Sequence, residues 1–119
     1  MLPNILYLHS HDTGRFISPY GHAFSTPNLQ HLAQEGTTFR QMFCAAPSCS
    51  PSRAALLTGQ CAHSSGMLGL AHRGWTLHDY SQHILHTLRR AGYTSTLCGI
   101  QHIAAGPESA KIIGYDEDL

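Results

Sequence analysis

A short apolar run close to the N-terminus, residues 3–8 (PNILYL), most limits how this chain can fold. A continuous apolar run of this length is typical of a parallel strand that is covered on both faces. A polar segment with a turn glycine, residues 9–14, follows it. Ligands of open α/β sheets bind beyond the carboxyl ends of the strands. We therefore expect functional side chains in residues 9–14.

Three helices are predicted from capping residues and apolar spacing. The first covers residues 26–36, with Thr26 as N-cap, a proline in the first position and a glycine at the end. The second is a short apolar run over residues 51–59, and Ser50 can cap it. The third covers residues 77–91, where the apolar side chains recur at helical spacing before a glycine.

Two further strands are predicted, over residues 38–44 and 93–98. Residues 60–75 are rich in glycine, histidine and serine, and a loop of this length indicates function rather than mere connection. The order β-α-β-α-α-β favours an α/β fold, a mostly parallel sheet flanked by helices. Because no evident finishing element precedes residue 119, we expect residues 1–119 to form the N-terminal part of a single, incomplete domain.

Composition argues against two classes of partner. Seven basic and seven acidic residues give a net charge of zero, whereas proteins that bind nucleic acid or membrane surfaces normally carry a basic excess. Met1 is followed by no signal-peptide pattern, and no apolar run approaches the length of a membrane span. We therefore expect a cytoplasmic protein. In that compartment the cysteines are expected to be thiols, and all but Cys49 to be buried: Cys44, Cys61 and Cys98.

The residues around Cys49 carry the clearest chemical signal. Cys49 stands immediately before a predicted helix, whose exposed N–H groups and dipole favour an anion beside this residue. Arg53, one turn further on, can direct a forked guanidinium at the same anion. A lone cysteine is more often a small buried residue. Together, however, these residue types predict a nucleophile next to an oxyanion site.

Residues 47–59 (PSCSPSRAALLTG) resemble the sulfatase signature, C-x-P-S-R followed by L-T-G, at every fixed position. Residues 26–36 are similar to a T-P-N-L helix of the same family, and residues 92–102 to its second signature, G-Y-x-T followed by G-K-x-H. The resemblance covers nearly the whole chain and only the N-terminal portion of a typical sulfatase. Within the family, residues 49–108 look most like heparan N-sulfatase-like members.

This resemblance implies an alkaline-phosphatase-like fold and hydrolysis of a sulfate ester or an N-sulfate. Cys49 would be oxidised to formylglycine by the formylglycine-generating enzyme, and would act as the aldehyde hydrate. Arg53 would hold this hydrate and the sulfate charge. His102 would be the general base that releases sulfate. Asp12 would bind a divalent metal, Ca²⁺ in this family.

Two positions depart from the family pattern. His11 stands where the family has the first aspartate of an acidic pair, and an imidazole suits transition metals better than Ca²⁺. Ligation by His11 is therefore left open. Ile100 stands where the family has a lysine that contacts sulfate, and isoleucine cannot supply that charge. His63 and His72, in the glycine-rich loop, are candidates for contact with substrate.

Three other functions are weighed against a sulfatase. A phosphate or phosphonate ester hydrolase of the same superfamily is favoured slightly by Ile100. A truncated polypeptide without activity is the second alternative, because the later metal ligands and a C-terminal lysine of the family lie outside these residues. A zinc module is the third, but the spacings from Cys44 to Cys49 and from Cys61 to His63 match no common zinc pattern.

Overall fold

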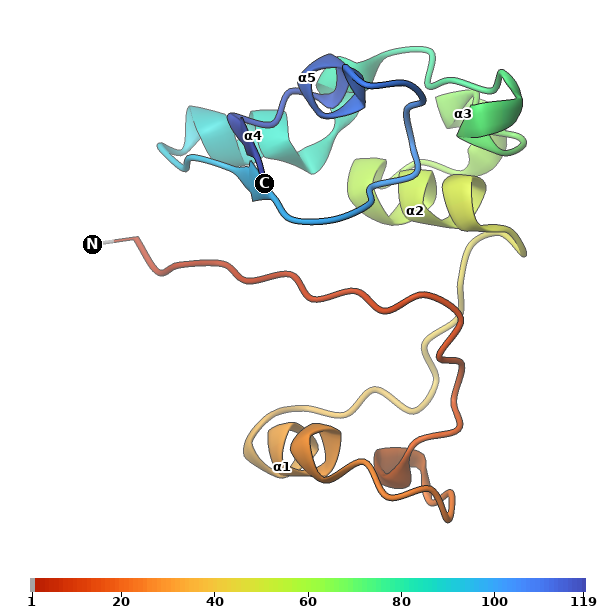
Figure 1. Cartoon of the computed structure of the whole chain (residues 1–119), viewed down its shortest axis with the longest axis vertical. Coiled ribbons are helices and arrows are strands. Elements are labelled where there is room, and N and C mark those ends of the chain that lie inside the picture. Colours follow the sequence, from red (N-terminus) through yellow and green to blue (C-terminus); the bar gives the residue numbers. More distant parts are fainter. Residues whose placement is uncertain (1) are drawn as a thin grey trace. The chain divides into compact units, whose positions relative to one another are not determined.

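The computed structural model describes residues 2–119, which divide into two compact units. Unit 1 extends to Met42, and unit 2 is Phe43–Leu119. Figure 1 shows that short helices and long connections dominate both units. The elements of unit 1 are the 3₁₀ helix η1 (Ser18–Tyr20) and α1 (Pro27–Glu35). Those of unit 2 are α2 (Cys49–Thr58), α3 (Ala62–Ser65), η2 (Ala71–Arg73), η3 (Tyr80–Gln82), α4 (Ile84–Arg90), β1 (Thr96–Leu97), α5 (Ser109–Ile113) and β2 (Glu117–Asp118).

Helix α1 of unit 1 lies where the sequence predicts a helix. Pro27 occupies its first turn and Thr26 its N-cap position, but the Thr26 hydroxyl does not cap the helix. It instead accepts a hydrogen bond of 3.0 Å from the Ser18 backbone N–H, which ties η1 to α1. An apolar groove of about 490 Å³ runs along α1 and is lined by Ile17, Pro19, Tyr20, Leu29, Leu32, Ala33, Gly36, Thr37, Thr38, Phe39 and Met42.

The predicted strands over residues 3–8 and 38–44 are not present in the structure. Residues 3–8 are extended but belong to neither strand, and their apolar side chains are exposed, Leu6 at 81% and Leu8 at 78%. Residues 38–44 form a turn and irregular backbone. An apolar pattern favours a strand only where neighbouring backbone completes the ladder. The α/β prediction is thus confirmed only in part: unit 2 is mostly helical and has one small parallel sheet.

The sheet of unit 2 consists of β1 and β2, paired in parallel with Thr96 opposite Glu117. Asp116, just before β2, accepts hydrogen bonds from the backbone N–H and hydroxyl of Ser95 at 2.7 and 2.8 Å. It also pairs with Arg89 of α4 at 2.6 Å. These bonds from Ser95 and Arg89 lower the pKa of the Asp116 carboxyl. The carboxylate therefore joins the sheet to the end of α4.

The helix predicted over residues 77–91 is interrupted at His83, which separates η3 from α4. His83 has an extended backbone, and its ring Nδ1 accepts a hydrogen bond of 3.2 Å from the Leu85 N–H. The imidazole thus acts as the N-cap of α4, a role normally filled by a short polar side chain. The side chain of His83 is buried, although residues 77–91 give no sign of a buried histidine.

The core of unit 2 is a single cluster of buried side chains drawn from α2, α4, α5 and the connections between them. Its members are Ala54, Met67, Ala71, Leu77, Leu85, Ile103, Ala104 and Ile113. Two of them bear on the candidate site. Ala54 is on α2, directly after Arg53, and Ile103 directly follows His102. The core therefore holds the backbone directly after Arg53 and directly after His102.

Candidate active site

Cys49 is the first residue of α2, so the helix begins two residues before the predicted one, which the sequence places after Cys49. Ser48 is the N-cap residue, and its carbonyl accepts a hydrogen bond of 3.0 Å from the Ser52 N–H. Ser50 does not cap the helix, contrary to the prediction. Its side chain is buried, and its hydroxyl accepts a bond of 3.1 Å from the Ala71 N–H. Ser50 therefore anchors the start of α2 to η2. Cys49, directly before it, is half-buried.

His102 lies next to Cys49 although the two residues are far apart in sequence. The Cys49 Sγ and a ring nitrogen of His102 are within 4.8 Å of each other. His102 has a left-handed backbone, with φ of 62°. Among the described residues, only His102 and Asp12 adopt positive φ without being glycine. Such a conformation costs a non-glycine residue on the order of 1–3 kcal/mol and persists where surrounding contacts hold it, often at functional sites.

Arg53 links α2 to the segment that carries His102. Its Nη1 donates a hydrogen bond of 3.0 Å to the backbone carbonyl of Ile100. The Ile100 side chain is 72% exposed and takes no part in this bond. A guanidinium carries five N–H donors, so this bond occupies only part of its capacity. Arg53, one turn after Cys49 in α2, is thus held near the helix N-terminus that favours anions.

His11 and Asp12 form their own pair in unit 1. The His11 Nδ1 lies 2.9 Å from an Asp12 carboxylate oxygen, and both side chains are exposed. Carboxylate oxygens suit hard cations such as Ca²⁺, while imidazole nitrogen suits transition metals. The donor chemistry of this pair therefore fits a divalent metal. It supplies only a small part of the about six to eight oxygen ligands that Ca²⁺ takes.

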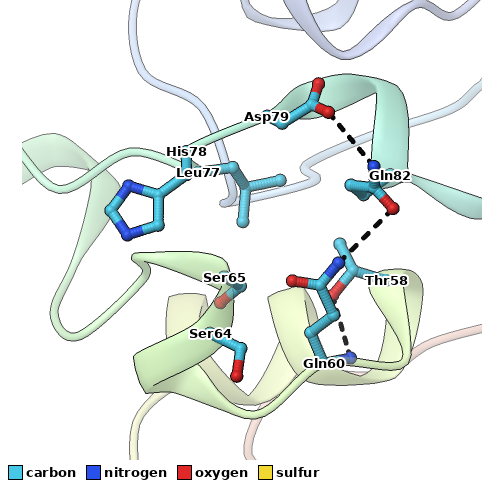
Figure 2. A pocket seen from close by; sticks show the side chains of 8 residues that line it. All are labelled: Thr58, Gln60, Ser64, Ser65, Leu77, His78, Asp79 and Gln82. Carbon is cyan, nitrogen blue, oxygen red and sulfur yellow. Dashed lines mark hydrogen bonds between the residues drawn. The ribbon is translucent and has the colours of Figure 1, made fainter.

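His63 and His72 are exposed on α3 and η2, respectively. Next to α3 is a polar pocket of about 270 Å³, lined by Ser64 and Ser65 but not by His63 (Figure 2). Its polar groups bond to one another: Gln60 donates to Gln82 at 3.5 Å, and Gln82 donates to Asp79 at 3.1 Å.

This pocket does not belong to the region around Cys49. It includes Thr58, the last residue of α2, whereas Cys49 is the first. A helix of this length spans about 15 Å, at 1.5 Å per residue. The pocket and the Cys49–His102 pair are therefore at opposite ends of α2.

The sequence also predicts that three thiols are buried, and this is wrong. Cys44, Cys61 and Cys98 are exposed, and all four cysteines are free. The pKa of the Cys61 thiol is lowered, chiefly by hydrogen bonds from Ser64. Sequence reasoning also missed Gln101. Its side chain is only 7% exposed and bonds to the backbone that follows His102. No pattern in the sequence marks this glutamine.

Comparison with known proteins agrees with the motif at α2. The family described as Sulfatase matches residues 3–117. N-acetylgalactosamine-6-sulfatase of Rattus norvegicus is 36% identical over 97% of this chain and 24% of its own length. N-sulphoglucosamine sulphohydrolase of Homo sapiens is 37% identical over 89% of this chain and 21% of its own length. Arylsulfatase A of Homo sapiens is 35% identical over 91% of this chain and 22% of its own length.

The chain thus spans about a quarter of the length of the curated relatives that it matches. None of the helices formed by the described residues has the length and apolar character needed to cross a bilayer. The family match extends over almost all of the sequence, and it includes both signatures that frame Cys49 and His102. The chain belongs to the sulfatase family.

Proposed function

We propose that this chain contributes the nucleophile of a hydrolase that cleaves a sulfate ester or an N-sulfate. The observation that carries the proposal is Cys49 at the start of α2, with a His102 ring nitrogen within 4.8 Å of its sulfur. The names of the relatives describe sulfatases that act on N-acetylgalactosamine 6-sulfate and on N-sulfoglucosamine, and an arylsulfatase. A sulfated saccharide or aryl sulfate is therefore the proposed substrate class.

In the proposed reaction residue 49 acts after oxidation to formylglycine by a formylglycine-generating enzyme. One hydroxyl oxygen of the aldehyde hydrate attacks the sulfate sulfur, and the bond from sulfur to the alcohol or amine breaks. His102 then takes the proton of the second hydroxyl, so that the bond from carbon to the sulfate oxygen breaks and the aldehyde returns. An unmodified thiol has no second hydroxyl for this release, which is why the oxidation is part of the proposal.

Arg53 has a binding role in this proposal. Its guanidinium can donate to sulfate oxygens through N–H groups other than the one bound to Ile100. The N-terminus of α2 adds its partial positive charge. Asp12, with His11 beside it, is the proposed holder of a divalent metal, which when bound would stabilise negative charge on the sulfate oxygens.

The proposal predicts a modified residue 49 in protein isolated from its native host. Trypsin is expected to release residues 41–53, which contain both Cys49 and Cys44. Fragmentation in a mass spectrometer should show that residue 49 has lost its sulfur and gained an aldehyde oxygen. Cys44 serves as control within the same peptide and should keep its thiol. Finding an unmodified Cys49 in every preparation would count against the proposed function.

A phosphate or phosphonate ester hydrolase is the second candidate, because Ile100 brings no positive charge to the position where sulfatases carry a lysine. Hydrolysis of a sulfate ester and a phosphate ester of the same phenol, measured side by side on protein from the native host, separates the two. We expect faster turnover of the sulfate ester. Faster turnover of the phosphate ester would instead support this candidate. The 119-residue chain alone is not expected to turn over either ester, because the family's later metal ligands lie outside it.

A further inference from the structure

Residues 100–104 present His102 to Cys49 in a backbone conformation that histidine does not favour. His102 has φ of 62°, whereas its neighbour Ile103 is completely buried in the core of unit 2. A turn of this kind is kept only where other contacts determine it. The side chains of Arg53, Tyr80 and Gln101 form hydrogen bonds with the backbone of this segment.

Gln101 makes most of these contacts. Its Oε1 accepts hydrogen bonds from the backbone N–H groups of Ile103 and Ala104, the latter at 2.9 Å. Its Nε2 donates to the Ala104 carbonyl at 3.0 Å. The amide is thus bonded on both its acceptor and its donor side to the two residues that follow His102. Because the glutamine is buried, these bonds replace bonds to water and are costly to break.

Two other side chains hold the ends of the segment. Arg53 donates to the Ile100 carbonyl before His102, and Tyr80 donates from its hydroxyl to the Ile103 carbonyl at 2.9 Å. Each makes one bond at one point of the segment. Of these three side chains, only that of Gln101 bonds across His102: its own backbone precedes the histidine, and its amide bonds to the backbone that follows.

We infer that Gln101 is a positioning residue, whose side-chain amide holds the turn that directs the His102 imidazole at residue 49. The inference rests on the proposed function in that it assigns His102 a task at residue 49. It adds a residue that the sulfatase signatures do not mark. The geometry that supports it, a ring nitrogen within 4.8 Å of the Cys49 sulfur, also gives a measurable effect in the thiol form of the chain.

The effect is the reactivity of Cys49 toward an alkylating agent. An imidazole beside a thiol can accept its proton as the sulfur attacks, and so acts as a general base. Iodoacetamide is added to the full chain with Cys49 as the thiol, and the rate at each cysteine is read by mass spectrometry. We expect His102→Ala to slow the alkylation of Cys49 by about tenfold, less than a base contributes in a complete active site.

Gln101→Met keeps the side-chain length but not the amide. It is expected to slow the alkylation of Cys49 by the same factor. In the double variant Cys49 should react no more slowly than in His102→Ala alone, because both substitutions remove the same effect of the imidazole on Cys49. Gln60→Met, a matched change at the other end of α2, should leave the Cys49 rate unaltered. In the Gln101 and His102 variants the rate at Cys61 should equal that of the original chain.

Either of two results would overturn the inference. One is a Gln101→Met chain that is folded, by its Trp75 fluorescence, and in which Cys49 reacts at the original rate. The other is an unaltered Cys49 rate in His102→Ala, since Gln101 would then have no imidazole effect to control. If Gln101→Met does not fold, Gln101→Asn replaces it, because the shorter amide cannot reach Ala104. The thiol assay needs no maturation, so its failure is distinct from a failure to find formylglycine.

Discussion

Replacing Met67 by alanine is expected to lower the free energy of unfolding of unit 2 by about 2–5 kcal/mol. Met67 has no exposed surface and lies in the core cluster, where its side chain meets residues from several connections. Its truncation removes apolar contacts and leaves a cavity that the surrounding backbone fills only in part. Because domains are stable by only about 5–15 kcal/mol, a loss of this size approaches unfolding.

Urea unfolding followed by Trp75 fluorescence measures this change, because Trp75 is the single tryptophan of the chain and belongs to unit 2. Leu68→Ala is the matched control. It removes a neighbouring aliphatic side chain that is 47% exposed, and such surface changes usually stay within about 0.5 kcal/mol. Equal losses in Met67→Ala and Leu68→Ala would contradict the core described for unit 2.

The second large effect is a loss of stability in mild acid that is due to His83. Burial, and to a lesser extent the charge of His86, lower the pKa of His83 from 6.5 to about 4. Its Nδ1 accepts the bond from Leu85, and its buried Nε2 has no hydrogen-bond partner among the described residues. The ring also packs edge-on against Tyr115, with centroids 6.0 Å apart. Protonation would place a positive charge among buried groups. It would also break the hydrogen bond from Leu85 by which the ring caps α4.

The direction of the pH effect follows from the two states of His83. Below pH 6.5 the unfolded chain binds a proton that the folded chain accepts only near pH 4, so folding becomes less favourable as the pH falls between these values. Unit 2 should keep its full stability above pH 6.5 and lose about 3 kcal/mol by pH 4. Asp79 and Asp116 affect stability in a different pH range, because their pKa values lie below the usual 3.8.

Unfolding free energies measured by Trp75 fluorescence at several pH values test this. In His83→Asn the decline between pH 6.5 and 4 should largely disappear, because asparagine can cap α4 without titrating. His72→Asn, which changes an exposed histidine of the same unit, should keep the decline. If the original chain and His83→Asn lose stability in parallel over this range, another group is responsible.

The parts of the structure that the sequence predicts well are those determined by local chemistry. Pro27 and the apolar spacing give α1, and the small residues after Cys49 give α2 with its left-handed C-cap at Gly59. A ring nitrogen of His102 lies within 4.8 Å of the Cys49 sulfur, but no local rule predicts the left-handed backbone that His102 adopts.

The predictions that failed depend on contacts between distant residues. Ser50 is a plausible cap by sequence, yet its hydroxyl is taken by Ala71. Residues 77–91 have helical spacing, yet the helix is broken at His83, whose buried ring packs against Tyr115. Residues 3–8 have the composition of a strand, but composition does not provide neighbouring strands. Gln101 acts through its bonds to Ile103 and Ala104, and these depend on the turn itself.

Residues 4–8 are largely apolar and exposed, and this exposure favours self-association of newly made chains. The segment contains no charge and no proline, and its large aliphatic side chains face outward. Segments of this composition serve as templates for β-aggregation between chains when they are accessible. Chaperones that hold extended apolar peptides would compete with this self-association. Soluble yield should therefore depend on chaperone supply and on protein concentration as much as on the stability of the folded units.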